Sequence, residues 1–129
     1  MNGIIVIDKE QGFTSHDVVA VLRGLLGEKH IGHTGTLDPN ATGVLPVCIG
    51  NAARIIEYMD KAPKVYLASA RFGMSTDTQD IWGNISSEKE YVPFSVSADL
   101  LLKTVSAFTG EVEQRPSVYS SIKVKGRHL

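Results

Sequence analysis

The amino-acid sequence predicts an α+β fold with a mixed, mostly antiparallel sheet flanked by helices. Short apolar runs typical of strands alternate with apolar residues at helical spacing, without a regular βαβ order. We find no internal repeat and no low-complexity segment. The 129 residues are 43% hydrophobic and 21% charged, which suits one domain with a buried core and argues against disorder or a coiled coil.

The N-terminal part predicts a strand followed by a helix. Residues 3–7 form a short apolar run, and we expect a buried strand there. Ser15 is expected to cap a helix that ends at Gly27. Its predicted inner face consists of apolar residues at helical spacing, namely Val18, Val19, Leu22, Leu25 and Leu26.

A second strand and helix are predicted after a loop rich in glycine and threonine. Residues 44–49 are apolar, and Pro46 within them indicates an edge strand or a bulge. Asn51 is expected to cap a helix that runs to about Met59. Its inward residues are predicted to be Ile55, Ile56 and Met59.

The second half predicts a strand, a polar loop, a helix and a last strand. Alternation over 64–72 is the strongest strand pattern, and 73–84 is a loop rich in Thr and Asp. Ser97 is expected to cap a helix that stops at Gly110, and residues 119–124 are predicted to be a strand. The apolar stripe of that helix comprises Leu100, Leu101, Val105 and Phe108.

Charge and cysteine content limit the classes of function. The net charge of −1 gives no general indication of nucleic-acid binding. Residues 114–129, however, contain four basic side chains and no acid, so they are either a solvated strand or the edge of an anion-binding face. The start of the chain lacks the pattern of a signal peptide, and no apolar run reaches the length of a membrane helix. Because Cys48 is the only cysteine, no internal disulfide is possible, and we expect a cytoplasmic protein.

Residues 32–43 are the most informative segment. They contain three glycines, three threonines, one proline, one histidine and one carboxylate, that of Asp38. Asp38-Pro39 is typical of a turn. A rigid turn can also present the carboxylate as a nucleophile or a base, so the two interpretations are compatible.

The remaining polar residues indicate neither a metal nor a cofactor. The four histidines show no zinc-ligand spacing, and His33 alone would more often be a structural residue. The threonines around Asp38 could donate to a phosphate, but the Lys-Ser/Thr end of a glycine-rich phosphate loop is absent.

Residues 32–46 strongly resemble the catalytic motif of the TruB family of tRNA pseudouridine synthases. Four further segments resemble the family's other motifs in the same order along the chain, namely 7–12, 64–66, 73–83 and 114–126. The resemblance covers essentially the whole chain. It implies the pseudouridine synthase fold, no cofactor, and isomerisation of uridine 55 in the T-loop of tRNA.

The resemblance also implies residue roles. Asp38 would be the nucleophile, and Tyr66 would stack on a flipped-out uracil. His33 would lie against the RNA where that base has left its stack. Lys9 would contact a phosphate or the active site, although a solvated surface lysine is the simpler expectation. Asp80 would orient a catalytic arginine, or else cap its own loop.

By the same resemblance, residues 1–129 are the N-terminal portion of a catalytic domain. The family's thumb, the second half of its catalytic domain and its C-terminal RNA-binding domain would be absent, and the fragment would be inactive. We expect a monomer whose partner is the T-stem-loop of tRNA, without a membrane or a metal. Two alternatives stay open: a non-catalytic RNA-binding scaffold, which Asp38 argues against, and a relative that depends on a guide RNA.

Overall fold

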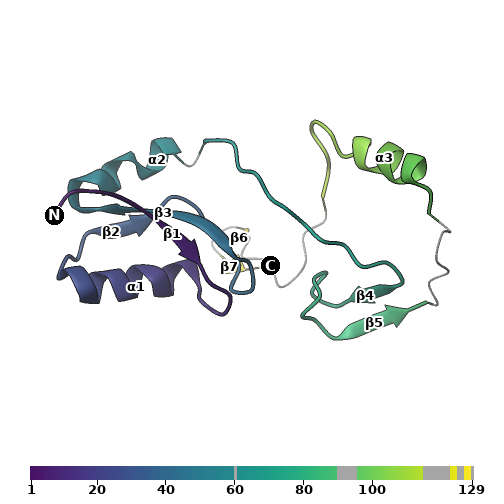
Figure 1. Ribbon diagram of the computed structural model, residues 1–129, viewed down its shortest axis with the longest axis horizontal. Coiled ribbons are helices and arrows are strands. Elements are labelled where there is room, and N and C mark those ends of the chain that lie inside the picture. The colour runs from purple at the N-terminus through teal and green to yellow at the C-terminus, as the bar shows by residue number, and fades with distance from the viewer. Residues whose placement is uncertain (60, 90–95, 115–122, 125–126, 129) are drawn as a thin grey trace. The chain divides into compact units, whose positions relative to one another are not determined.

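The structure is a computed structural model in two compact units, Met1–Tyr66 and Leu67–Leu129, each of which is described by itself (Figure 1). The described residues are 1–59, 61–89, 96–114, 123–124 and 127–128. Residues 119–122 of the predicted last strand therefore lie outside the described part.

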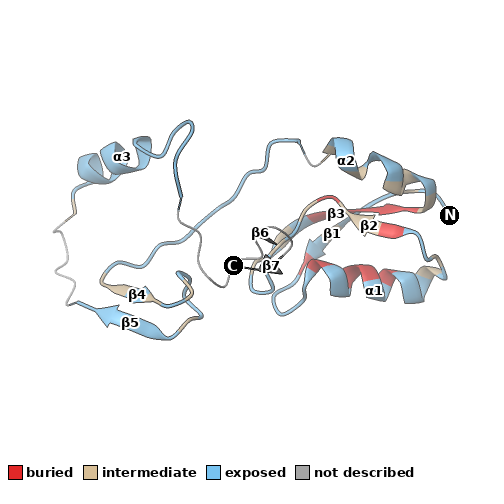
Figure 2. Cartoon of the chain, turned by 180° about the vertical axis from the view of Figure 1, so that it is seen from behind, coloured by how far each residue is buried: buried red, intermediate tan, exposed pale blue. Residues whose placement is uncertain are grey.

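The first unit is a three-stranded antiparallel sheet with helices. The strand order is β1-β3-β2, with β3 paired to both neighbours. In both views of the chain, α1 lies on one side of the sheet and α2 on the other (Figures 1 and 2). This arrangement confirms the predicted α+β class. The elements are β1 (Gly3–Lys9), α1 (Ser15–Leu26), β2 (Ile31–His33), β3 (Gly43–Ile49), the 3-10 helix η1 (Gly50–Ile55) and α2 (Ile56–Met59).

Helix α1 begins one residue earlier than its predicted cap implies. The N-cap is Thr14, whose hydroxyl accepts a hydrogen bond from the Asp17 N–H at 3.0 Å. The Asp17 carboxylate accepts one from the Thr14 N–H at 2.8 Å, which completes a capping box. Ser15 is thus the first helical residue, and its hydroxyl is used elsewhere. Gly27 ends the helix as predicted, in the left-handed conformation with φ of 61°.

The core lies between α1 and one face of the sheet (Figure 2). Leu25, which was predicted to face inward, is 76% exposed. The buried set consists of Val18, Val19 and Leu22 from α1, with Ile31, Leu45, Val47 and Ile49 from the sheet. Successive side chains of a strand alternate between faces, so Cys48 belongs to the opposite face, where it is also fully buried. Both faces are therefore covered near the end of β3.

Pro46 lies in the central strand, which contradicts the predicted edge position. Its carbonyl accepts a hydrogen bond from the Thr34 N–H at 3.1 Å. The return bond cannot form because proline has no N–H. Strand β2 ends at His33, the residue before Thr34. The proline therefore coincides with the end of pairing on one side of β3 and leaves the pairing with β1 intact.

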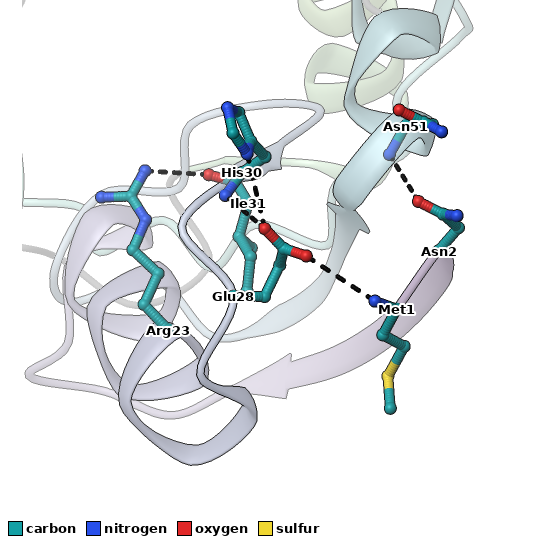
Figure 3. Close-up of polar contacts among 7 residues, drawn as sticks. All are labelled: Met1, Asn2, Arg23, Glu28, His30, Ile31 and Asn51. Carbon is teal, nitrogen blue, oxygen red and sulfur yellow. Dashed lines mark hydrogen bonds and ion pairs between the residues drawn. The ribbon is translucent and has the colours of Figure 1, made fainter.

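The predicted helix after β3 forms, but without Asn51 as its cap. Residues 50–55 are a 3-10 helix with Ile49 at the N-cap, and Ile55 is exposed instead of inward. The Asn51 N–H donates to the Asn2 side-chain oxygen at 2.7 Å (Figure 3). The inserted side chain of Asn2 thus takes over the capping role that the sequence assigned to Asn51.

A cluster of polar contacts connects the start of β1, the end of α1 and β2 (Figure 3). Glu28 lies 3.6 Å from the Met1 amine and 3.5 Å from the His30 imidazole. The Arg23 guanidinium donates to the Ile31 carbonyl at 3.0 Å. The His30 N–H donates to Glu28 and thereby lowers the pKa of this carboxyl. These contacts hold the start of β2, whose last residue is His33.

Residues 64–72, the strongest strand pattern in the sequence, do not form a strand. In the described structure this segment is extended but pairs with no strand, and its side chains are exposed (Figure 2). Val65 is 96% exposed and Tyr66 67% exposed. Alternation predicts a strand only where a partner supplies the ladder hydrogen bonds, and the described residues supply none here.

The second unit contains a hairpin and a helix. The predicted loop over 73–84 is partly a strand, because its first residues pair with those that follow it. Ser97 caps α3 as predicted, accepting from the Leu100 N–H at 3.1 Å. The helix ends at Ser106, four residues before the predicted stop at Gly110, which has a φ of 92°. The predicted apolar stripe of α3 is exposed among the described residues. The elements are β4 (Met74–Thr76), β5 (Ile85–Glu88), α3 (Ala98–Ser106), β6 (Lys123–Val124) and β7 (Arg127–His128).

Candidate active site

Asp38 opens a tight turn and its side chain is exposed. The Ala41 N–H donates to the Asp38 carbonyl at 3.0 Å, which closes the four-residue turn. Pro39 occupies the second position, where its fixed φ favours a turn. The predicted turn is therefore confirmed, and it leaves the carboxylate in solvent.

The residue before Asp38 is fixed by Ser15. The Leu37 N–H donates to the Ser15 hydroxyl at 2.9 Å, and this hydroxyl lies 3.3 Å from the Leu37 carbonyl, to which it donates. Ser15 is only 2% exposed, and the Leu37 side chain packs against the core. The first turn of α1 thus anchors the loop backbone immediately before Asp38.

The residue after Asp38 is fixed by Lys9. The Pro39 carbonyl accepts hydrogen bonds from the Gly12 N–H at 2.8 Å and from the Lys9 ammonium at 3.2 Å. The same ammonium donates to the carbonyls of Phe13 at 2.6 Å and Glu10 at 3.0 Å. Lys9 is 1% exposed, so the expected solvated surface lysine is wrong. Its position beneath the turn makes it a positioning residue, while contact with a phosphate stays a prediction.

A buried cation of this kind is stable because three carbonyl oxygens replace its water. Together, Ser15 and Lys9 hold both neighbours of Asp38 and leave its side chain free. Because the backbone on either side is fixed, less conformational freedom remains to be lost when the carboxylate attacks a substrate. The arrangement can therefore support nucleophilic or general-base chemistry.

His33 is the last residue of β2 and leads into the loop that carries Asp38. Its Nδ1 atom is buried and has no hydrogen-bond partner among the described residues. Buried polar atoms are almost always bonded, so this nitrogen is an exception among the described residues. The adjacent Thr34 is buried and bonded through its N–H to Pro46.

A pocket of about 980 Å³ opens between this loop and the η1–α2 segment. Its walls come from residues 33–36 on one side and 53–58 on the other. The second wall includes Arg54 and Tyr58, which are both exposed. The sequence analysis did not identify Arg54 and Tyr58. Their spacing of one helical turn directly after a buried strand could have indicated that they share one face.

Gly32 allows the walls of this pocket to lie close together. A Cβ atom at Gly32 would lie 2.8 Å from the Cδ1 atom of Ile56, so glycine permits α2 to approach β2. A Cβ atom at Gly35 would lie 3.5 Å from the Cε atom of Lys64. The segment that carries Tyr66 therefore passes beside the loop two residues earlier. Tyr66 itself is exposed, and its predicted stacking role stays a prediction.

Asp80 lies in the second unit, at the turn between β4 and β5. One of its carboxylate oxygens accepts three hydrogen bonds from its own turn. Its hydrogen bond from the Thr78 hydroxyl is the main reason why the pKa of this carboxyl lies below its ordinary value. Loop capping by Asp80 is thus observed, and an arginine partner stays a prediction.

Among the described residues, no group of three or more His, Cys, Asp or Glu side chains could hold a metal ion. The same part of the chain has no helix that is long and apolar enough to cross a membrane. Cys48 is buried, which raises the pKa of its thiol.

The sequence profile of the TruB family pseudouridylate synthase (N-terminal domain) matches residues 23–129. The chain belongs to the TruB family of pseudouridylate synthases. This match includes the Asp38 turn, the pocket walls and the Asp80 turn. The predicted family is thereby confirmed.

Several bacterial relatives of this TruB-family chain are named tRNA pseudouridine synthase B. Those from Lactobacillus acidophilus, Pediococcus pentosaceus and Streptococcus pyogenes are 49%, 46% and 47% identical over the whole chain. The chain spans 43–44% of the length of these relatives. A solved structure described as a Cbf5-Nop10-Gar1 complex is 28% identical, with a TM-score of 0.58 over 94% of this chain and 31% of that one.

Proposed function

We propose that this chain carries the nucleophile of a tRNA pseudouridine synthase that converts uridine 55 of the T-loop to pseudouridine. The observation that carries the proposal is the exposed Asp38 carboxylate on a turn whose two flanking residues are bonded to buried side chains. The names of the relatives support tRNA as the substrate.

The reaction needs one bond to break and another to form. The bond between C1′ of the ribose and N1 of uracil breaks, the base turns, and C1′ joins C5. The proton that leaves C5 is replaced by one on N1, so the atoms balance. Asp38 acts as the nucleophile that holds the intermediate while the base turns, and it leaves again at the end. Attack on the sugar and attack on the base are both compatible with an exposed carboxylate.

Tyr66 and His33 are proposed to handle the uridine. A target base in a folded loop must leave its stack, which costs a few kcal/mol. Tyr66, exposed on the segment beside Gly35, can stack on the flipped uracil. The imidazole of His33 can occupy the gap that the base leaves.

The pocket wall offers one positive charge to the RNA. Arg54 is exposed there, whereas Lys9 is buried and bonded to backbone. We therefore assign Arg54 to a phosphate of the RNA. Because the relatives are more than twice as long as this chain, further contacts, including an arginine partner for Asp80, belong to the remainder of such a protein. Action as a monomer in the cytoplasm is part of the same proposal.

Asp38→Asn in the full-length protein tests the nucleophile. Tritium release from T-stem-loop RNA labelled at C5 of uridine should be abolished, while binding of this RNA should change less than about threefold. Asp99→Asn, an exposed acid in the first turn of α3, is the matched control and should keep full turnover. Substantial turnover by Asp38→Asn would remove Asp38 from this role.

The motif in residues 32–46 also leaves open a relative that depends on a guide RNA. The same assay separates the two. A stand-alone enzyme modifies T-stem-loop RNA without any other RNA or protein, whereas a guided enzyme requires both. Identities of 46–49% to proteins named tRNA pseudouridine synthase B favour the stand-alone enzyme.

A further inference from the structure

The turn between β4 and β5 is held together by Asp80. Its Oδ1 atom accepts hydrogen bonds from the Thr78 hydroxyl at 2.7 Å, the Trp82 N–H at 2.8 Å and the Gly83 N–H at 3.1 Å. The Thr76 hydroxyl donates to the Asp80 carbonyl at 2.6 Å. The backbone at Trp82 is therefore bonded directly to the carboxylate that organises the turn.

A second set of bonds closes the turn at its base. The Asp77 carboxylate accepts from both the N–H and the side-chain amide of Asn84, at 2.9 and 3.1 Å. Gly83 fits only because it has no side chain, since a Cβ atom there would collide with Thr78 Oγ1 and lie 2.5 Å from Asp77 Oδ1. The turn is thus closely packed around its own polar groups, and its conformation is well defined.

Two large apolar side chains stand on this well-defined turn. Ile81 is 65% exposed and Trp82 is 60% exposed. The turn pairs its exposed polar groups with one another and leaves the side chains of Ile81 and Trp82 at the surface. A rigid backbone that presents an exposed tryptophan is suited to binding a flat partner, because little side-chain freedom remains to be lost.

The charge around the tryptophan defines which part of an RNA can bind. Asp77 and Asp80 are the titratable groups of this turn, and both carboxyl groups have a lowered pKa, chiefly through side-chain hydrogen bonds from Asn84 and Thr78. Two carboxylates repel a phosphate but do not repel the face of a base. The turn can therefore accept a base and not the sugar-phosphate backbone.

We propose that Trp82, flanked by Ile81, is a platform on which an unpaired base of the RNA substrate stacks. This inference rests on the proposed function, because it takes the substrate to be RNA. It adds Trp82 to the binding residues assigned above. Stacking on an aromatic ring tolerates any base, so Trp82 contributes affinity and position instead of sequence selectivity.

Intrinsic fluorescence tests this contact directly, because Trp82 is the single tryptophan of the 129 residues. The full-length protein is measured as its Asp38→Asn variant, so that the RNA stays unmodified. The emission of Trp82 is obtained by subtracting the spectrum of the Asp38→Asn, Trp82→Phe double variant from that of Asp38→Asn. Adding unmodified T-stem-loop RNA should quench this emission saturably, with the same Kd as filter binding. Emission that does not respond to saturating RNA would overturn the proposal, as would shielding of Trp82 from acrylamide in the free protein.

Binding by matched variants provides a second readout. Trp82→Ala should raise the Kd for the RNA by about 5- to 160-fold, the range expected for one stacked base, and Trp82→Phe should restore most of the affinity. The salt dependence of Kd should not change, because no phosphate contact is lost. Phe108→Ala removes another exposed aromatic side chain, 70% exposed, and should leave the Kd unchanged.

Equal affinity of Trp82→Ala and the parent protein would overturn the proposal, and so would failure of Trp82→Phe to restore binding. Thermal unfolding of each variant shows whether the fold is retained. Tritium release by the protein with Asp38 intact is measured in parallel. A failure of the proposed isomerisation and a failure of the Trp82 contact are then seen separately.

Discussion

The hydroxyl of Ser15 bonds both the N–H and the carbonyl of Leu37, at 2.9 and 3.3 Å. One buried side chain at the start of α1 therefore fixes the residue that precedes the candidate nucleophile. Because Thr14 takes the capping role, the Ser15 hydroxyl is available for this loop. The position of Asp38 depends in this way on a helix that begins more than twenty residues earlier in the chain.

Ser15→Ala should lower the free energy of unfolding by about 1–3 kcal/mol, because two backbone groups of Leu37 lose their buried partner. Turnover should fall more than RNA affinity, since the change moves the loop and removes no contact with RNA. Ser106→Ala, which removes an exposed hydroxyl bonded within α3, should change stability by less than about 0.5 kcal/mol. Denaturant unfolding and single-turnover tritium release measure the two effects. Unchanged values for both would contradict the anchoring role.

Lys9→Met keeps a long side chain but removes the ammonium that joins Glu10, Phe13 and Pro39. We expect a loss of about 2–3 kcal/mol in stability, because three part-buried carbonyls lose their hydrogen bonds to a charged group. Lys103→Met on α3, where the side chain is exposed, is the matched control. If RNA binding weakened while chemical denaturation was unchanged, Lys9 would be a substrate contact and not a positioning residue.

The β4–β5 turn should loosen in acid. The folded pKa of Asp80 is lowered, so its contribution is present above its unfolded pKa and is lost as pH falls through the folded value. The change therefore lies below roughly pH 4, the ordinary Asp range. The amide proton shifts of Trp82 and Gly83 in NMR spectra should move together in this range. Asp80→Asn should remove this pH transition. If the transition persisted in the variant, another acid would be its cause.

Arg54→Ala tests the assigned phosphate contact. A plot of log Kd for T-stem-loop RNA against log salt concentration should become shallower by about one unit, because one fewer counterion is released. The thermal midpoint should not change, since Arg54 is exposed. Lys103→Ala removes an equal charge on α3 and should leave the slope as it is. An unchanged slope for Arg54→Ala would place the phosphate elsewhere.

Local chemistry was predictable where it depends on neighbours along the chain. The Asp38-Pro39 turn, the Gly27 stop and the Ser97 cap all formed as expected, because each needs only a few adjacent residues. Prediction failed where the partner is distant. The alternating segment 64–72 found no strand to pair with among the described residues, and Pro46 occupies a central strand because β2 ends beside it.

The candidate site divides in the same way. The residues 32–46 by themselves identified the family and singled out Asp38, because the motif is long and local. Only the tertiary structure showed that Lys9 is buried beneath Pro39, that Ser15 holds Leu37, and that Arg54 faces the loop across a pocket. Those relationships join residues 22 or 30 positions apart, or come from separate elements. Residue types along a chain determine which turns and caps can form, whereas packing of α1 and α2 against the sheet decides which polar groups meet.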